Sequence, residues 1–471
     1  MVRPLLIGGE WVPSRDLRPV YAPYDGEILG EVAYAQEEHI ERVIALQGTA
    51  QAAAARLSTG ERYLILDKLA QRLAAEKETI ARLIAREAAK PIRYARVEVE
   101  RGLLTITTGR DLVRTLTGEV LPADLNEALQ GRLALVQRKP AGPLLAITPF
   151  NFPLNLVLHK VIPAVVAGCA ITLKPAPQAP LTAFWVAEAL LQAGWPPQAL
   201  TVLLADPPLA EKLVRSPAFR VFSFTGSAAV GWHLQTLAAR KKTLLELGGS
   251  AAVIVHDPPN LESAARAIAE AAYLYSGQTC ISVQRIFVQR KLYADFVAAY
   301  QAAVQQLKGG NPLDENVHYS SLIDEKAYKR IESWLTEARL GGAQDLLPTT
   351  MIPEKRLLTP VLLTDVPSES ALAQEEAFAP YAEIQLYDTI DEAITRVNAS
   401  PYGLHAGIYT QSESILKKAW EELEVGGVVH NAPPTLRLDH LPYGGVKASG
   451  LGREGVKYAV MEYTEPKVLL W

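Results

Sequence analysis

The chain has 471 residues, of which 49% are hydrophobic and 21% are charged. A single hydrophobic core stops growing at roughly 250 to 300 residues, so we expect two large folded domains and not a disordered chain. The formal net charge of −4 provides no basic surface for a phosphate backbone. A nucleic-acid partner is therefore not expected.

The apolar runs and the cysteines exclude further classes of protein. The richest apolar run, LNLVLHKVIPAVVAG, is interrupted by His159, Lys160 and Pro163. It falls short of the roughly 20 residues that cross a membrane. Because the N-terminal residues also lack a signal-peptide core, we expect a cytoplasmic location and no membrane partner. The two cysteines, Cys169 and Cys280, are too few for a disulfide framework or a structural zinc site, so no metal is expected.

The N-terminal part of the chain shows helical periodicity followed by β-like runs. Residues 37–110 form a region rich in Ala, Arg and Glu that Gly60 and Pro91 are expected to interrupt. We expect these helices to cover one face of the first sheet. Residues 117–138 contain two β-like runs without the helix that a parallel βαβ unit needs, which predicts a projecting hairpin.

From about residue 144 onwards, short apolar runs alternate with longer amphipathic segments. The strand-like runs are LLAITPF, CAITLKP, ALTVLLA, FRVFSFTGS and KTLLELGGS, and a second block begins at AAVIVHD. This alternation is typical of parallel βαβ units and predicts an α/β fold with two doubly wound domains. The C-terminal YTEPKVLLW predicts one more strand, of the kind that pairs with an exposed edge or a second chain.

Two residues at the ends of predicted elements are candidates for covalent chemistry. Cys280 lies in GQTCIS, at a turn between a helical and a strand-like segment, where reactive groups are commonly displayed. An isolated cysteine is more often a small buried hydrophobe, and Cys169 in GCAITL fits that description. Glu246 follows an apolar strand in LLELGGS, where a carboxylate is poorly placed as solvated surface. It is a plausible general base.

Two other strand ends carry polar groups. Asn151 follows the strand in ITPFNFP, where its amide could supply a hydrogen bond to an oxyanion, although an asparagine there is more often a turn or capping residue. Thr225, Gly226 and Ser227 lie between a strand and a helix in FTGSAAVG, the arrangement that presents free N–H groups to a phosphate. Each signal is weak by itself.

Seven motifs, taken in order, resemble those of the aldehyde dehydrogenase superfamily over nearly the whole chain. They are PFNFP around Asn151, LKPAP around Lys174, FTGSAAVG, LELGGS around Glu246, GQTCIS around Cys280, EEAFAP around Glu376 and Phe378, and PYGGVKASGLGREG from Pro442. The branch of lactaldehyde and non-phosphorylating glyceraldehyde-3-phosphate dehydrogenases is the most similar. The resemblance implies an NAD(P)-dependent enzyme that oxidises an aldehyde to the carboxylic acid.

The resemblance also assigns the domains and an assembly. It implies a dinucleotide-binding domain formed by residues 1–116 and 139–248, and a catalytic domain formed by residues 249–462. Residues 117–138 and 463–471 would be oligomerisation strands. A homodimer or homotetramer is therefore expected.

The same resemblance assigns roles to individual residues. Cys280 would attack the aldehyde, Asn151 and the Cys280 backbone N–H would hold the oxyanion, and Glu246 would activate the water that hydrolyses the thioester. Lys174 would bind the adenosine ribose, Glu376 the nicotinamide ribose, and Phe378 would pack beside it. The pyrophosphate would face Thr225, Gly226, Ser227 and Gly231. Pro177 stands where NAD-preferring members often have an acid, so either NAD or NADP is expected.

The substrate is expected to be a small polar aldehyde such as lactaldehyde, glyceraldehyde or a semialdehyde. His159, Arg437 and His440 are candidate substrate contacts, although His159 could equally be a core histidine and the other two could pin a loop. Thr279, directly before the cysteine, stands where enzymes acting on phosphorylated aldehydes carry arginine. This difference counts against a doubly charged substrate.

Three other functions are compatible with parts of the pattern. In a CoA-acylating semialdehyde dehydrogenase, CoA would resolve the thioester, but such enzymes usually lack the base that Glu246 supplies. A non-catalytic structural member of the family would not need Asn151, Glu246 and Cys280 together. A cysteine hydrolase would need a histidine partner for Cys280, and none of the eight histidines lies in a recognisable partner motif.

Overall fold

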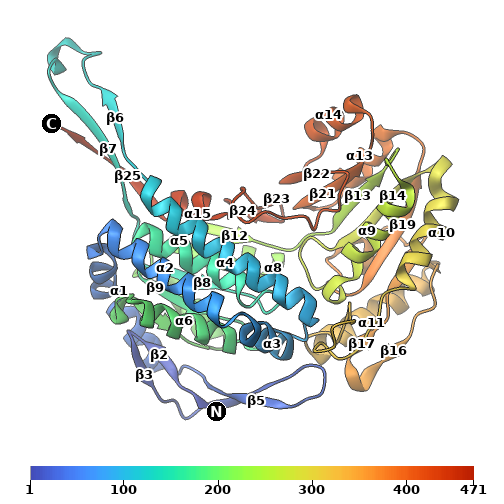
Figure 1. The fold of residues 1–471 in the computed structure, drawn as a ribbon, viewed down its shortest axis with the longest axis horizontal. Coiled ribbons are helices and arrows are strands. Elements are labelled where there is room, and N and C mark those ends of the chain that lie inside the picture. Colours follow the sequence, from blue (N-terminus) through green and yellow to red (C-terminus); the bar gives the residue numbers. More distant parts are fainter. Residues whose placement is uncertain (1) are drawn as a thin grey trace.

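The computed structural model describes residues 2–471. Figure 1 shows two α/β units side by side and a long arm that projects from the first unit. Each unit is built around its own large, mostly parallel sheet. This arrangement confirms the predicted α/β fold with two large units and a small β element.

The first sheet has eight strands in the order β24-β12-β11-β8-β9-β10-β2-β3. Its five central strands are parallel to their neighbours, so their carboxyl ends lie at one edge. They are the buried apolar runs of the sequence, as expected for a sheet that is covered on both faces. The strands are β2 (Leu5–Ile7), β3 (Glu10–Val12), β8 (Leu144–Ile147), β9 (Ile171–Lys174), β10 (Leu200–Val202), β11 (Val221–Thr225), β12 (Lys242–Glu246) and β24 (Gly450–Leu451).

Helices from the N-terminal third pack over one face of this sheet, as predicted (Figure 1). They are α1 (Glu37–Arg56), α2 (Thr59–Ala75), α3 (Lys77–Ala88) and α4 (Ile92–Thr115). The helices α5 (Asn155–Ala167) and α6 (Leu181–Ala193) join the same core, whereas α7 (Pro207–Arg215) and α8 (Ala228–Ala238) pack on the opposite face. Pro91 precedes α4 as predicted, but Gly60 lies inside α2. The break lies at Ser58 instead, where the Ser58 side chain accepts from the Glu61 N–H and the Glu61 carboxylate accepts from the Ser58 N–H.

The second sheet has seven strands in the order β15-β18-β19-β14-β13-β21-β22. They are β13 (Ala251–Val255), β14 (Val283–Gln289), β15 (Gln344–Asp345), β18 (Val361–Thr364), β19 (Tyr381–Tyr387), β21 (His405–Tyr409) and β22 (Gly427–His430). Its helices are α9 (Leu261–Tyr273), α10 (Tyr293–Val304), α11 (Glu325–Leu340), α12 (Ala371–Gln374), α13 (Ile390–Asn398) and α14 (Glu413–Glu422). The loop between α9 and β14 carries Cys280.

The C-terminal part of the chain returns to the first unit. β24 pairs with β12 in antiparallel register, and α15 (Val456–Glu462) contributes its apolar side chains to the core under the first sheet. The predicted catalytic domain extended to residue 462, so it included a segment that the structure places on the other unit. A two-residue strand and a seven-residue helix carry too little periodicity to reveal such a return.

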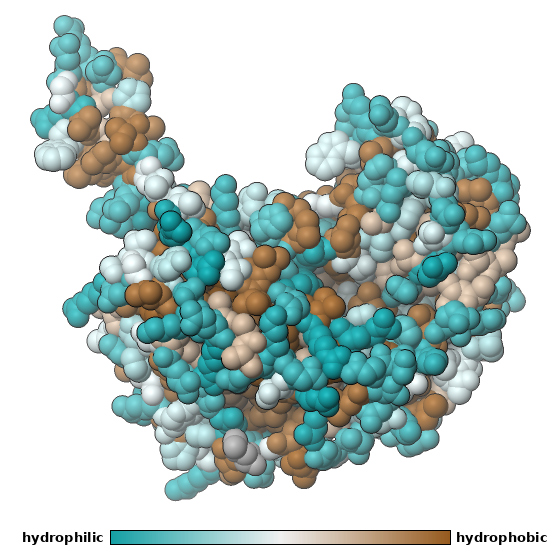
Figure 2. Space-filling view, in the orientation of Figure 1, coloured by the Kyte–Doolittle hydropathy of each residue, from teal (hydrophilic) through white to brown (hydrophobic). Residues whose placement is uncertain are grey.

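The arm consists of three antiparallel strands in the order β25-β7-β6. They are β6 (Glu119–Pro122), β7 (Leu133–Pro140) and β25 (Thr464–Leu470). The exposed fractions of its apolar side chains reach 69% at Val120, 92% at Leu125 and 73% at Trp471. Figure 2 shows hydrophobic surface on this arm.

Smaller pairings complete the fold. They join β1 (Val2–Arg3), β5 (Ile28–Ala33) and β4 (Leu17–Tyr21), then β16 (Met351–Ile352) with β17 (Leu357–Leu358), and β20 (Tyr402–Gly403) with β23 (Val446–Lys447). In the part of the chain that the structure describes, no helix is both long enough and apolar enough to span a bilayer.

Candidate active site

A cavity of about 520 Å³ lies at the carboxyl edge of the first sheet, beside the loop that carries Cys280. The strands β8, β11 and β12 end here because they are parallel neighbours, and such an edge is where open α/β sheets bind ligands. Residues from both units line it, among them Asn151, Thr225, Gly226, Ser227, Glu246, Gly248, Cys280, Glu376, Phe378, Arg101, Arg437 and Tyr443.

Cys280 reaches this cavity from the turn between α9 and β14. Its Sγ lies 3.0 Å from the Tyr443 hydroxyl. Burial raises the pKa of the thiol to about 11, and the hydrogen bond with Tyr443 acts in the opposite direction. By contrast, Cys169 is fully buried in the core under the first sheet, as the sequence predicted.

Asn151 follows β8 and is held by the loop of the cysteine. Its Nδ2 donates to the Gln278 carbonyl at 3.0 Å, two residues before Cys280. An amide nitrogen carries two hydrogens, so one donor remains for a ligand. Within residues 2–471, the Asn151 Oδ1 is buried without a hydrogen-bond partner. Asn151 therefore faces the cavity with unused hydrogen-bonding capacity.

Glu246 is the last residue of β12 and faces the same cavity. Both of its carboxylate oxygens are buried and have no hydrogen-bond partner among the described residues. Burial raises the pKa of Glu246 well above its usual value, and the nearby charge of Glu454 raises it further. Proteins rarely leave a carboxyl group in this state unless it is functional.

Glu454 and Lys160 form a buried pair beside Glu246. The Lys160 Nζ donates to Glu454 Oε1 at 3.0 Å and to the Ser223 hydroxyl at 2.9 Å. Burial opposes ionisation of Glu454, but Lys160, His159 and Arg437 together outweigh it and lower the pKa to about 2. The pKa values of the two carboxyl groups are therefore shifted in opposite directions.

Arg437 borders the cavity with a side chain that is only 7% exposed. Its Nε has no hydrogen-bond partner in the described chain. Its nearest carboxylate contacts are long: Nε lies 3.5 Å from Asp439, and an Nη atom lies 3.6 Å from Glu454. The guanidinium rests on the Tyr443 ring, 3.6 Å from its centroid. Arg437 is thus a buried cation with unused donors.

Asp439 is already occupied by other partners, among them Arg101, His159 and Asn155. Arg101 donates to its two oxygens at 2.9 and 2.7 Å, and His159 Nε2 lies 2.9 Å from Oδ1. Burial opposes ionisation of Asp439, but the hydrogen bonds from His159 and Arg101 hold its pKa far below the usual value. Burial also lowers the pKa of His159, so this imidazole is neutral at physiological pH.

The other end of the cavity is suited to a dinucleotide. Thr225, Gly226 and Ser227 stand between β11 and the first turn of α8, as predicted for a phosphate contact. The buried Thr225 hydroxyl has no hydrogen-bond partner among residues 2–471. Glu376 accepts from the Gly249 N–H at 3.1 Å, and burial raises its pKa to about 7. These groups provide a polar, partly unsatisfied cradle.

Glycine is required where this cradle is most crowded. A Cβ on Gly248 would lie 2.4 Å from a carboxylate oxygen of Glu376, and one on Gly231 would lie 2.2 Å from Leu247. Phe378 adopts a positive φ of 48° and packs edge to face on Phe150, with the ring centroids 5.9 Å apart. The backbone around Glu376 is therefore closely fitted.

Lys174 and Pro177 lie further along the same sheet edge. Lys174 ends β9, and burial lowers the pKa of its ammonium group. Pro177 is exposed in the loop that follows. Neither residue is among those that line the cavity that contains Cys280, so their place at the adenosine end of a dinucleotide stays a prediction.

The structure brings most of the predicted residues together but separates two of the substrate candidates. Arg437 borders the cavity, whereas His159 is 1% exposed behind it and contacts Asp439 and Arg437. His440 is exposed and is not among the lining residues. A direct substrate contact from either histidine is therefore not supported by the geometry.

Sequence reasoning missed four residues of the site, namely Tyr443, Glu454, Lys160 and Arg101. Tyr443 and Glu454 lie inside the motif PYGGVKASGLGREG, which indicates the family but assigns no role to either side chain. Lys160 offered a signal of its own, because a lysine within a fully buried apolar helix needs a counter-ion. No local signal marks Arg101 on the long helix α4.

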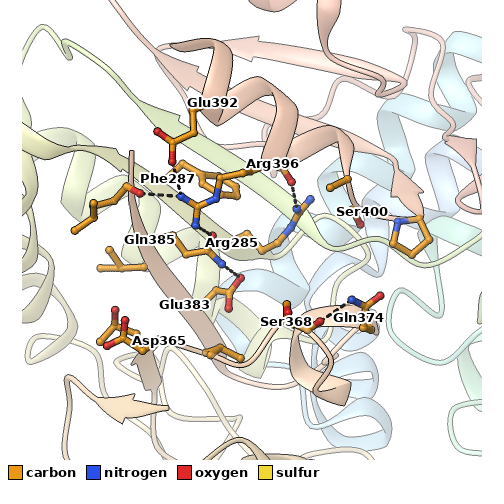
Figure 3. A pocket seen from close by; sticks show the side chains of 17 residues that line it. Arg285, Phe287, Asp365, Ser368, Gln374, Glu383, Gln385, Glu392, Arg396 and Ser400 are labelled. Atoms are coloured by element: carbon orange, nitrogen blue, oxygen red, sulfur yellow. Dashed lines mark hydrogen bonds and ion pairs between the residues drawn. The ribbon is translucent and has the colours of Figure 1, made fainter. Parts of the chain in front are cut away.

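A second cavity of about 610 Å³ lies against the second sheet and is shown in Figure 3. Several of its polar side chains bind one another or the main chain: Arg285 donates to the Ser250, Arg396 and Val397 carbonyls, and Gln385 donates to Glu383. None of the predicted site residues is among its described lining residues. Across residues 2–471, no group of three or more His, Cys, Asp or Glu side chains is arranged to hold a metal ion.

Known proteins match this chain over its whole length. The 3-sulfolactaldehyde dehydrogenase of Priestia aryabhattai is 37% identical over 99% of this chain and 97% of its own. The NADP-dependent glyceraldehyde-3-phosphate dehydrogenase of Bacillus halodurans, solved with NADP, is 34% identical and superimposes with a TM-score of 0.95 over 100% of this chain and 99% of its own.

Another solved structure is an aldehyde dehydrogenase from the moss Physcomitrella patens in complex with its reaction product succinate. It is 34% identical, with a TM-score of 0.96 over 100% of this chain and 98% of its own. A model of the aldehyde dehydrogenase family matches residues 11–469. These matches confirm the resemblance seen in the motifs. The chain belongs to the aldehyde dehydrogenase family and is an NAD(P)-dependent aldehyde dehydrogenase.

Proposed function

We propose that Cys280 is the nucleophile, and that this enzyme oxidises a small polar aldehyde to its acid through a thioester that water hydrolyses. The observation that carries this mechanism is the convergence of Cys280, Asn151 and Glu246 on one cavity. The Cys280 thiolate forms a bond to the aldehyde carbon, and the carbonyl electron pair moves onto oxygen. The free amide hydrogen of Asn151 stabilises that oxyanion.

A bound nicotinamide cofactor would supply the acceptor for the hydride that leaves the substrate carbon. Thr225, Gly226, Ser227 and Gly231 would face its pyrophosphate, Glu376 its nicotinamide ribose and Lys174 its adenosine ribose. The unsatisfied Thr225 hydroxyl and the crowding around Gly248 and Gly231 support this assignment. Both NAD and NADP are compatible with the exposed Pro177, because no carboxylate stands there to repel a 2′-phosphate.

Glu246 completes the reaction by removing a proton from the water that attacks the thioester. Its raised pKa makes it a stronger base than an exposed carboxylate once it has ionised. The presence of this base in the cavity favours hydrolysis over transfer to CoA. It also argues against a non-catalytic member of the family.

The aldehyde is proposed to carry an anionic or hydroxyl substituent. Arg437 supports this choice because it is a buried cation with an unsatisfied Nε and only long contacts to carboxylates. Arg101 borders the same cavity, although its guanidinium is paired with the Asp439 carboxylate. Relatives that act on sulfolactaldehyde or bind succinate are consistent with a single carboxylate or sulfonate at this place.

The test is an assay of cofactor reduction with a panel of aldehydes and without CoA. The reaction is monitored by the absorbance of the reduced nicotinamide. Lactaldehyde, glyceraldehyde, succinic semialdehyde and 3-sulfolactaldehyde would be compared with propanal, each with NAD and with NADP. Wild type is expected to turn over, Cys280→Ala to be inactive, and Glu246→Gln to release one equivalent of reduced cofactor and stop. Turnover by Cys280→Ala would refute the nucleophile, and a strict need for CoA would establish the acylating alternative.

We also propose that the arm joins two copies of this chain in a homodimer or homotetramer. The exposed fractions of 61% at Val468 and 73% at Trp471 support burial against another chain. In light scattering during gel filtration, Val468→Asp is expected to lower the assembly mass, whereas Leu340→Asp, at an 86% exposed site outside the arm, is the matched control. A monomeric wild-type protein would refute this proposal.

A further inference from the structure

Tyr443 is the hydrogen-bond partner of the proposed nucleophile. Its hydroxyl lies 3.0 Å from Cys280 Sγ, and in residues 2–471 this is the sole hydrogen bond that involves the thiol. We propose that Tyr443 is a catalytic residue that donates its hydroxyl hydrogen to the Cys280 thiolate and so increases the fraction of reactive thiolate. This inference rests on the proposed role of Cys280 as the nucleophile.

The direction of the hydrogen bond follows from ionisation. While Cys280 is a thiol, either group can donate. After the thiol has released its proton to solvent, only the phenol carries a hydrogen, so the phenol must donate to the thiolate. A hydrogen bond to an ionised acceptor is about twice as strong as one between neutral groups. The Tyr443 hydroxyl therefore stabilises the thiolate more than the thiol and lowers the free energy of ionisation.

Tyr443 can fill this role because it keeps its own proton. Burial raises the pKa of its phenol well above the ordinary value, and the charge of an ionised Cys280 raises it further. The hydrogen bond between the two groups lowers the pKa of the thiol and raises that of the phenol, so it favours ionisation of the thiol over that of the phenol. The proton that leaves the site comes from sulfur, and the phenol stays a donor throughout.

The hydroxyl is held in place from three sides. The Tyr443 N–H donates to the Glu454 carbonyl at 3.0 Å, and the Glu454 N–H donates to the Tyr443 carbonyl at 2.7 Å. The Arg437 guanidinium lies over one face of the ring, 3.6 Å from the centroid, and His405 packs edge-on with centroids 4.9 Å apart. Little reorganisation is needed when the thiolate forms, because the donor is already in position.

The other titratable groups near the thiol act in both directions. Arg437 favours the thiolate, whereas Glu246 and Glu376 disfavour it. Burial lowers the pKa of His405 to about 4, so this imidazole carries no charge at neutral pH. Tyr443 is the hydrogen-bonding group in this set, and removing its hydroxyl changes no formal charge.

The experiment is alkylation of Cys280 by iodoacetamide in the cofactor-free enzyme between pH 7 and 9.5. The rate of alkylation depends on the fraction of Cys280 that is ionised, and the measurement needs no catalytic turnover. Tyr443→Phe removes a single oxygen and keeps the ring between Arg437 and His405. We expect its second-order rate constant to fall about tenfold at each pH, the effect of a thiol pKa higher by about one unit. Tyr300→Phe, which removes another buried hydroxyl remote from the cavity, is expected to match wild type.

A reduction of less than threefold in Tyr443→Phe would overturn the proposal, and a larger reduction that Tyr300→Phe does not share would support it. Unchanged melting temperatures would exclude a folding defect as the cause. Mass spectrometry would confirm alkylation at Cys280. Cys280→Ala tests the nucleophile separately by turnover, so failure of the proposed function and failure of the Tyr443 inference give different results.

Discussion

Replacing Arg437 by methionine separates binding of the substrate's charged group from the chemistry at Cys280. Methionine retains an apolar stem against the Tyr443 ring but removes the guanidinium. Hydrogen bonds to a charged group contribute about 1.5 to 3 kcal/mol each, so two such bonds to a substrate carboxylate, taken at about 1.5 to 2 kcal/mol each, contribute about 3 to 4 kcal/mol. At about 1.4 kcal/mol per factor of ten, this is a loss of roughly 100- to 1000-fold. The ionised Glu454 and Asp439 would then repel an anion, which acts in the same direction.

The assay is kcat/KM for succinic semialdehyde and for propanal in wild type and in Arg437→Met. In Arg437→Met, kcat/KM for succinic semialdehyde is expected to fall by roughly 100- to 1000-fold, and kcat/KM for propanal by less than about fivefold. Arg437 also favours the Cys280 thiolate, but that effect is common to both aldehydes and cancels in their ratio. Equal losses for the two aldehydes would refute an anion-binding role for Arg437.

Two substitutions and one pH profile test the cofactor cradle, the buried pair and the thiol. Gly248→Ala places a Cβ 2.4 Å from Glu376, so KM for the dinucleotide is expected to rise about tenfold or more in steady-state kinetics, while alkylation of Cys280 stays unchanged. Lys160→Met leaves Glu454 as an uncompensated buried charge and is expected to lower the free energy of unfolding by about 3 to 5 kcal/mol in urea titrations. The double variant with Glu454→Gln should recover part of this lost stability, because the buried charge is then removed as well. With a thiol pKa of about 11, alkylation of the cofactor-free wild type should rise about tenfold per pH unit between pH 7 and 9.5, and a flat profile would contradict this.

Much of the fold could be predicted because its large sheets are built from buried apolar strands that alternate with helices. The strands β8, β11 and β12 stand where the apolar runs indicated, and their parallel order brings the residues that follow them to one edge. For this reason Asn151, Thr225 and Glu246, all at strand ends, could be selected from the sequence. Their shared edge follows from topology alone.

The rest of the site depends on contacts between distant segments. Arg101 and Asp439 are separated by 338 positions, and neither stands at the end of a large-sheet strand. The Tyr443 contact with Cys280 joins positions that are 163 apart and depends on the return of the C-terminal segment to the first unit. Periodicity reports only neighbours along the chain, so it reveals neither contact. His159 shows the reverse case, since its residue type suggested a ligand contact while its helix buries it behind the cavity.

Two neighbouring carboxyl groups in a buried site cannot both ionise readily, and Lys160 decides which one does. Its ammonium group contacts Glu454 and not Glu246, so the pKa of Glu454 is lowered while that of Glu246 stays raised, and Glu246 keeps its proton to a higher pH than Glu454 does. Glu246 must lose that proton before it can activate water. Hydrolysis of the thioester should therefore accelerate as the pH rises through the raised pKa of Glu246, whereas the ionised Glu454 remains a constant charge. The same burial that makes Glu246 a strong base thus limits the fraction of enzyme that is ready to use it.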